Sequence, residues 1–421
     1  MDSRLSRYIP PYASDYTGVA ASLYDLDGMV VFCDAGCCTD HYVLNDEPRW
    51  RRRQGLCFST HLRSTEAVLG SDSDMVDRVC GIAGSVEREL PFVAVMGTPV
   101  PGIVGMDMPG VASEIEARLG VPALGFDTAG FRYYDSGIEL AARTVFERFA
   151  EDVAATGGAC ESGGGAEGDR GHGTVNILGA TPLDFGDVGN EDDFAALFEG
   201  AGWTIGLQFP MNARMEDVAH VGAAQVNIAV SAAGIRIARY LEGRFGTPYV
   251  VGCPAGPLDG PLDREILAAA EEVAAGRRPS GWWCDDVTDD AQAEVDGERT
   301  ATAEGEVERP TLVIADQVVG ESIRRLLEER DGEGVDTHGP VLVASPFAWD
   351  ARHARPGDFA FKTEGELVAR FARLRPARLV ADPIFVFLCR PVEADCTFAP
   401  LTHCAVSGKL HWDDAARLSR L

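Results

Sequence analysis

Lysine is almost absent from this chain, since Lys362 and Lys409 are the only two among 421 residues. The sequence contains no G-x-x-x-x-G-K-[ST] phosphate-binding loop, so we do not expect this chain to bind nucleotide or hydrolyse ATP itself. The H-E-x-x-H zinc motif and the G-x-S-x-G nucleophile elbow are also missing, which removes two common classes of hydrolase.

Long apolar runs are missing too. No stretch of 18 apolar residues could cross a bilayer, and the N-terminal segment lacks the apolar core of a signal peptide. We therefore expect a cytoplasmic protein without membrane contact, in which the eleven cysteines are thiols or metal ligands. A net charge of −29 and the absence of basic runs argue against a nucleic-acid partner.

Short apolar runs alternate with helix-like patterns along three parts of the chain, which is typical of α/β domains. We expect an N-terminal α/β domain at 1–152 that contains a cysteine turn, a second at 172–280 and a C-terminal one at 309–421, with an acidic linker at 281–308. The strand-like runs are 91–97, 121–126, 174–180, 203–209, 225–231, 247–253, 309–316, 339–345 and 377–383.

The Gly-rich segment at 156–174 interrupts this alternation. Gly163, Gly165 and Gly168 have the G-x-G-x-x-G spacing of dinucleotide-binding loops. That motif requires a strand before it and a helix after it, whereas here no strand precedes and a strand follows. We therefore favour a solvated linker.

Three cysteines cluster at the end of the apolar run "GMVVFC" (28–33) and directly after it. Cys33 ends this run, and a small buried core residue is the favoured interpretation. Cys37 lies in a polar, Gly-containing turn where packing gives no reason for sulfur, and a thiolate at a strand end could hold iron. The C-x-x-x-C spacing does not continue to a radical-type triplet, because Asp40 stands where the third cysteine would be needed.

These residues lie in segments that resemble the component 1 proteins of nitrogenase and of nitrogenase-like reductases. "DYTGVAASLYDLDGMVVFCDAGC" (15–37) is similar to that family's opening segment, in which a Gly-Cys after the first long strand carries a bridging cluster ligand. "CFSTHLRSTEAVLGSDSDM" (57–75) and "GTPVPGIVGMDMPGVASEIEARLGVPALGFDTAGFRYYDSG" (97–137) resemble its next two signatures. The resemblance spans most of the chain and implies three Rossmann-like domains with parallel sheets around a metal site.

Carried onto this sequence, the resemblance places Gly36 and Cys37 at the cluster. Thr98 stands at the family's Cys-Pro position, and Ser14 or Tyr16 stands near its first cysteine, so this chain offers fewer ligands than a nitrogenase chain. The resemblance thus implies a four-iron cluster, of the 4Fe-4S type, shared between two chains and handled anaerobically. The candidate ligands are Cys37, Cys38, Cys33 and Cys57.

The resemblance further implies a homodimer, or a heterodimer with a related chain, that receives low-potential electrons from a separate P-loop iron–sulfur ATPase and reduces an unknown small substrate. An assembly scaffold that holds a metal cofactor without turnover is the alternative, and a small-molecule binding protein with incidental cysteines is a third. Cys253, His403 and Cys404 are the residues left for a second cofactor, and packing roles are favoured for them.

Two further segments have an ordinary and a functional interpretation. Tyr133 and Tyr134 could face a cleft between domains, but rings packed on a sheet with surface hydroxyls are favoured. "NDEPRWRRR" (45–53) could be a docking edge, but a solvated, salt-bridged loop is favoured.

Overall fold

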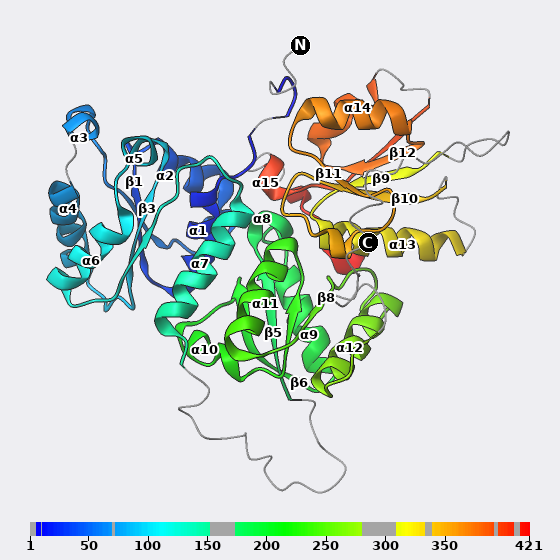
Figure 1. Cartoon of the computed structure of the whole chain (residues 1–421), viewed down its shortest axis with the longest axis horizontal. Coiled ribbons are helices and arrows are strands. Elements are labelled where there is room, and N and C mark those ends of the chain that lie inside the picture. Colours follow the sequence, from blue (N-terminus) through cyan, green and yellow to red (C-terminus); the bar gives the residue numbers. More distant parts are fainter. Residues whose placement is uncertain are drawn as a thin grey trace, which may run out of the picture.

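Among the residues that the structure describes, the strands form three separate sheets, in which every neighbouring pair is parallel. This computed structural model describes residues 6–9, 11–69, 72–151, 173–279, 309–332, 339–390, 395–407 and 413–421. The expected α/β class with parallel sheets is confirmed. We call each sheet with its helices a unit, N-terminal, central or C-terminal (Figure 1). The acidic linker expected at 281–308 and most of the Gly-rich segment lie outside the described residues.

The strand orders are β2–β1–β3–β4, β6–β5–β7–β8 and β11–β10–β9–β12–β13 in the N-terminal, central and C-terminal sheets. In each sheet the order reverses beside the first strand, and open α/β sheets bind ligands beyond the carboxyl ends of the strands at such a point. The strands are β1 (Met29–Cys33), β2 (Leu56–Ser59), β3 (Val93–Gly97), β4 (Ala123–Phe126), β5 (Gly173–Ala180), β6 (Trp203–Pro210), β7 (Val226–Ala229), β8 (Tyr249–Val251), β9 (Thr311–Ile314), β10 (Val341–Ser345), β11 (Phe359–Ala360), β12 (Arg378–Ala381) and β13 (Thr397–Pro400).

The helices cover the sheets and begin with recognisable signals, such as the capping box of Thr363 and Glu366 before α14. Among the described residues, no helix is both long and apolar enough to span a bilayer. The α-helices are α1 (Asp15–Leu23), α2 (Cys37–His41), α3 (Ser64–Leu69), α4 (Asp72–Gly84), α5 (Pro99–Val104), α6 (Met108–Leu119), α7 (Tyr134–Phe149), α8 (Pro182–Phe185), α9 (Asn190–Gly200), α10 (Met215–Ala219), α11 (Ala232–Phe245), α12 (Pro261–Ala274), α13 (Gln317–Gly332), α14 (Glu364–Leu374) and α15 (Cys404–Ser407).

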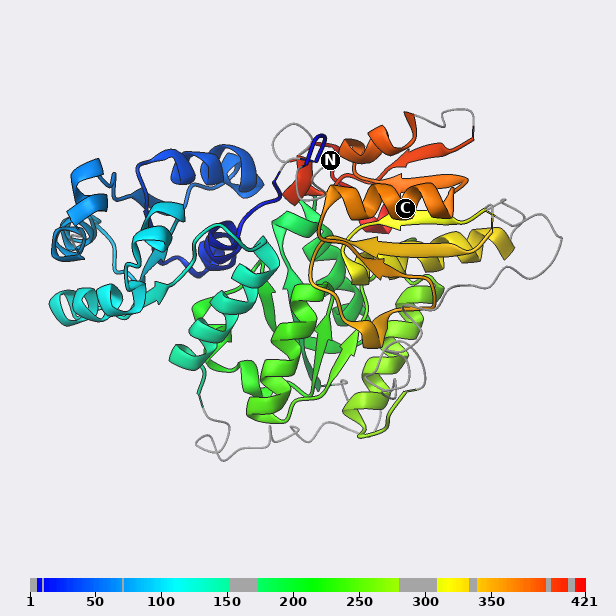
Figure 2. The same ribbon diagram turned by 45° about the horizontal axis from the view of Figure 1, so that its top comes forward.

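The N-terminal sheet is buried on both faces, because strand residues alternate between two apolar layers. Met29, Val31 and Cys33 pack with residues of α4 and α6. Val30 and Phe32 point the other way, into the large core that includes α1 and α7. Figure 2 shows this unit at one end of the molecule, with the central and C-terminal units beside each other at the other end.

Helices α1 and α7 cross in backbone contact at their first turns. A Cβ added at Gly18 would lie 2.0 Å from the carbonyl oxygen of Tyr134, and one added at Gly137 would lie 1.9 Å from that of Asp15. Just before the helices, Ser14 and Tyr133 pair as an antiparallel bridge. Only glycine permits this approach, so the two positions fix the crossing.

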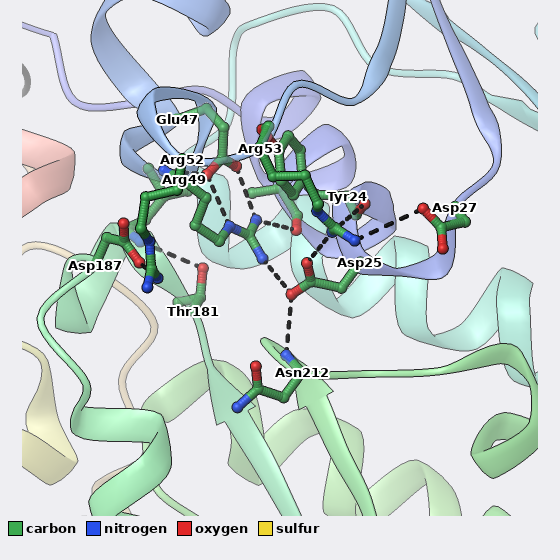
Figure 3. A network of polar contacts seen from close by, with 12 residues as sticks. Tyr24, Asp25, Asp27, Glu47, Arg49, Arg52, Arg53, Thr181, Asp187 and Asn212 are labelled. Atoms are coloured by element: carbon green, nitrogen blue, oxygen red, sulfur yellow. Dashed lines mark hydrogen bonds and ion pairs between the residues drawn. The ribbon is translucent and has the colours of Figure 1, made fainter.

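An ion-pair network joins the N-terminal unit to the central one (Figure 3). The Arg49 side chain, in η3 (Pro48–Arg51), is 6% exposed and donates to Glu47 (2.7 Å) and Asp25 (2.8 Å). Asp25 also accepts the backbone N–H of Asn212 (2.9 Å), and Arg52 pairs with Asp187. The expectation of a solvated, salt-bridged loop at 45–53 is confirmed for its ion pairs. It is wrong about solvation for Arg49, because this guanidinium is desolvated among fixed acceptors.

We predict that Gly137→Ala lowers the free energy of unfolding by more than about 2 kcal/mol, because the added methyl group would overlap with the carbonyl oxygen of Asp15. Gly243→Ala in α11 is the matched control, since nothing lies within 4 Å of its added Cβ. The free energy of unfolding of this control should rise by up to about 1 kcal/mol, because alanine has a better helix propensity than glycine. Urea unfolding curves measure both, and equal midpoints for the two variants would contradict the proposed crossing constraint.

Candidate functional site

The four loops that follow the strands of the N-terminal sheet meet at its carboxyl edge, because these strands are all parallel. The cysteine turn follows β1, and Thr98 follows β3. These two strands are neighbours and flank the point where the strand order reverses. The predicted site residues Gly36, Cys37, Cys38 and Thr98 are thus brought to one edge.

A buried carboxylate, Asp34, shapes the cysteine turn. Its side chain accepts the backbone N–H (2.9 Å) and the hydroxyl (3.0 Å) of Thr39, and the hydroxyl of Ser59 (2.5 Å). The turn from β1 into α2 is thereby tied to the end of β2. Gly36 has φ +109°, in the left-handed region that favours glycine. Cys37 consequently begins α2 with its side chain exposed.

The other predicted thiols differ from Cys37 in burial. Cys38 is partly buried and contacts the Tyr16 hydroxyl, and burial raises its pKa to about 11. Cys33 is fully buried in the sheet core, as its favoured interpretation had it. Cys57 lies within β2, where burial raises its pKa to about 12. Cys37 is therefore the one exposed thiol of this set, while Cys38 and Cys57 are partly buried.

Thr98 does not present its hydroxyl to solvent. The residue is 1% exposed and donates to the carbonyl oxygen of Cys33 (2.7 Å). It thus ties the loop after β3 to the end of β1, beneath the cysteine turn. His61 carries no motif that would have singled it out in the sequence, yet its ring lies 3.3 Å from where a Cβ of Gly36 would be.

Exposed apolar side chains lie on the same edge as Cys37. Val100, Ile103 and Val104 of α5 are 40%, 73% and 45% exposed, and Phe131, in the loop after β4, is 73% exposed. We call these four residues the apolar patch. Large apolar side chains gathered at one edge are typical of surfaces that another protein covers.

The residues that the structure describes do not make a complete ligand set for a metal cluster. Among the described residues, no group of three or more His, Cys, Asp or Glu side chains is placed to hold a metal ion. An exposed Cys37 beside the partly buried Cys38 fits a cluster to which a second chain adds ligands. Cys253 and Cys404 are buried, and burial raises the pKa of both thiols.

A second buried carboxylate, Asp46, supports the same region from the end of η2 (Tyr42–Asp46). It accepts the hydroxyl of Thr17 in α1 (3.1 Å) and lies 3.6 Å from the Nε2 atom of His41. Burial raises its pKa to about 6, although His41 and the Thr17 hydroxyl act in the opposite direction.

A family model described as "Nitrogenase component 1 type Oxidoreductase" matches residues 14–300. The chain is similar to a subunit of light-independent protochlorophyllide reductase from Synechococcus sp. (strain JA-3-3Ab), with 33% identity over 87 residues, 20% of this chain and 17% of that protein. The same-named subunit of Nostoc punctiforme is 32% identical over 95 residues, 22% of this chain and 19% of that protein. These matches cover less than a fifth of either relative.

Two solved structures share the fold over nearly the whole chain. "Nitrogenase Cp1 at pH 6.5" superposes with a TM-score of 0.65 at 12% identity, covering 100% of this chain and 92% of that one. "Nitrogenase Cp1 at pH 5" gives a TM-score of 0.62 at 14% identity, covering 98% and 86%. At such identities the likeness concerns the fold alone.

We predict that Asp46→Asn removes part of the pH dependence of stability. The folded pKa of about 6 exceeds the ordinary value of 3.8, so the native state binds more protons between these values. The free energy of unfolding of the wild type should therefore fall between pH 4 and pH 6, by up to about 3 kcal/mol from this group. Urea unfolding at several pH values measures the fall. Asp40→Asn controls for net charge, and parallel curves for wild type and Asp46→Asn would contradict the prediction.

Proposed function

Because this chain belongs to the nitrogenase component 1 type oxidoreductase family, we propose that it is the larger component of an ATP-driven reductase. Members of this family hold metal–sulfur clusters and work with a separate reductase component. In this proposal a P-loop iron–sulfur ATPase delivers low-potential electrons to a cluster at Cys37, and this chain binds the small substrate. The near absence of lysine and the missing phosphate-binding loop leave nucleotide hydrolysis to the partner.

The observation that carries the proposal is the placement of Cys37, exposed at the point where the strand order reverses and on the same edge as the apolar patch. A bound four-iron cluster would supply one-electron transfer at low potential. Asp34 holds the turn that presents Cys37, and Cys38 offers a second sulfur beside it. A second chain, identical or related, would cover the apolar patch and supply the remaining ligands.

An assembly scaffold for a metal cofactor is the second candidate. It would use the same exposed thiols and the same fold, since fold alone does not decide function. The two functions differ in electron transfer: the enzyme's cluster receives electrons in an ATP-dependent step, and the scaffold's cluster does not.

We predict that Cys37→Ala loses most of the iron bound after anaerobic reconstitution with iron and sulfide. Cys80→Ala, at a partly exposed thiol of α4 away from the carboxyl edge, should keep its iron. Ile103→Glu leaves every thiol in place but charges the apolar patch, so it should weaken dimerisation in sedimentation and lower the iron content with it. A colourless wild type, or equal iron in both cysteine variants, would refute the assignment of Cys37.

We predict that cluster reduction requires both ATP and the partner. The measurement mixes the reconstituted protein anaerobically with a P-loop iron–sulfur ATPase and follows the reduced cluster by electron paramagnetic resonance, with and without ATP. The Cys37→Ala variant is the matched control and should give no signal. A cluster that the partner never reduces would favour the scaffold.

A further inference from the structure

Away from the cysteine turn, the carboxyl edges of the central and C-terminal sheets face each other. Helix α8 follows β5, α15 follows β13, and these two short helices are in contact with each other. Helix α1 also contacts α8, so all three units meet here, near the centre of Figure 1. We call this place the junction. Both β5 and β9 flank the points where their sheets reverse order, and ligand sites form beyond such strand ends.

One ionisable side chain from each unit reaches the junction. The Tyr134 hydroxyl, at the start of α7, donates to Oδ1 of Asp184 in α8. The Nε2 atom of His403, just before α15, lies 3.2 Å from the same oxygen and 3.4 Å from the Tyr134 oxygen. The Asp184 side chain is 1% exposed, and Tyr134 and His403 are buried.

The hydrogen-bond partners of Tyr134 and His403 determine which of their atoms carry a hydrogen. Burial and the Asp184 carboxylate raise the pKa of Tyr134 well above its usual value, so its hydroxyl is a donor. Since Oδ1 of Asp184 accepts, the histidine Nε2 facing it must carry hydrogen, and the Nδ1 of a neutral ring is then an acceptor. Neither Nδ1 of His403 nor Oδ2 of Asp184 has a hydrogen-bond partner among the described residues, although both are buried. Buried acceptors without a donor are rare and costly.

Asp184 and His403 line a cavity of about 20 Å³. A single water needs roughly 10–15 Å³ on this measure, so the cavity has room for one water molecule or for a group of similar size. Apolar side chains such as Phe185, Ile314 and Leu401 form most of the remaining lining. The Phe347 ring stacks on His403 with centroids 4.8 Å apart, so the chain's own aromatic side chains fill the junction.

We propose that Asp184 and His403 form a buried acid–base site that binds a small hydrogen-bond donor, either water or an O–H or N–H group of a small substrate, and that Tyr134 is a positioning residue. The inference rests on the proposed function, because a reduction takes up protons with its electrons. After the partner's electrons reach the substrate, Nδ1–H of the imidazolium gives its proton to the anionic product, whose electron pair forms the new bond. The ring returns to neutral, and Asp184 stabilises the imidazolium that solvent protons restore.

The first test reads the histidine tautomer by ¹⁵N NMR of the full-length, histidine-labelled protein. His403→Gln identifies the signal, which we expect to show Nε2–H and a hydrogen-bonded Nδ1. Asp184→Asn should move the Nε2 signal toward a weaker hydrogen bond. Tyr134→Phe removes the competing donor from Oδ1 of Asp184. The His403 Nε2 signal should then move toward a stronger hydrogen bond, which a merely structural tyrosine would not cause.

Asp263→Asn is the matched control, since it makes the same substitution at a buried aspartate in another helix, α12. It should leave the His403 signal unchanged. An Nδ1–H tautomer in the wild type, or a signal that Asp184→Asn does not move, would overturn the proposal.

The second test uses water as the probe. A high-resolution crystal structure should show one ordered water within hydrogen-bonding distance of Oδ2 of Asp184, and a dry cavity would overturn the proposal. Neither test needs iron, ATP or the partner. Failed cluster reduction would therefore remove the proposed function and leave these results standing, whereas a dry cavity with normal cluster reduction would remove only the acid–base site.

Discussion

The backbone contact between α1 and α7 is the constraint on which both candidate sites depend. Gly18 and Gly137 allow the first turns of these helices to touch, and the bridge from Ser14 to Tyr133 fixes where they begin. Tyr16, one residue into α1, thereby reaches Cys38 at the edge of the N-terminal sheet. Tyr134, at the start of α7, reaches Asp184 in the central unit. A shift of either helix would move both contacts together.

The two candidate sites are built in opposite ways, and their chemistry explains the difference. In the proposed function, a shared cluster needs thiols that a second chain can reach, and Cys37 meets this need because it is exposed on a turn held by the buried Asp34. Proton transfer to a small molecule needs a place from which bulk water is excluded, because hydrogen bonds and charges act more strongly there. The Asp184 carboxylate is accordingly buried within the molecule.

Local patterns in the sequence were sufficient to predict the α/β class with parallel sheets and many of its strands. Apolar runs such as 91–97 and 174–180 became β3 and β5. Helix α11 ends just before Gly246, which has φ +75°. The same patterns do not reveal pairs that are distant along the chain. Asp184 and His403 are over two hundred residues apart, so neither residue type nor spacing indicates their contact. Tyr134 was expected to keep its hydroxyl at the surface, but its partner comes from another unit.

The large net negative charge of the chain limits which interactions could hold two copies together. Each copy carries a net charge of −29, so long-range electrostatics oppose their approach. At physiological ionic strength such repulsion is screened beyond roughly 8 Å, which leaves contact forces to decide. The apolar patch supplies such a force, because burial of Ile103 and Phe131, each 73% exposed, removes apolar surface from water. The proposed association at this edge should therefore strengthen with salt, since salt screens the repulsion and does not weaken apolar burial.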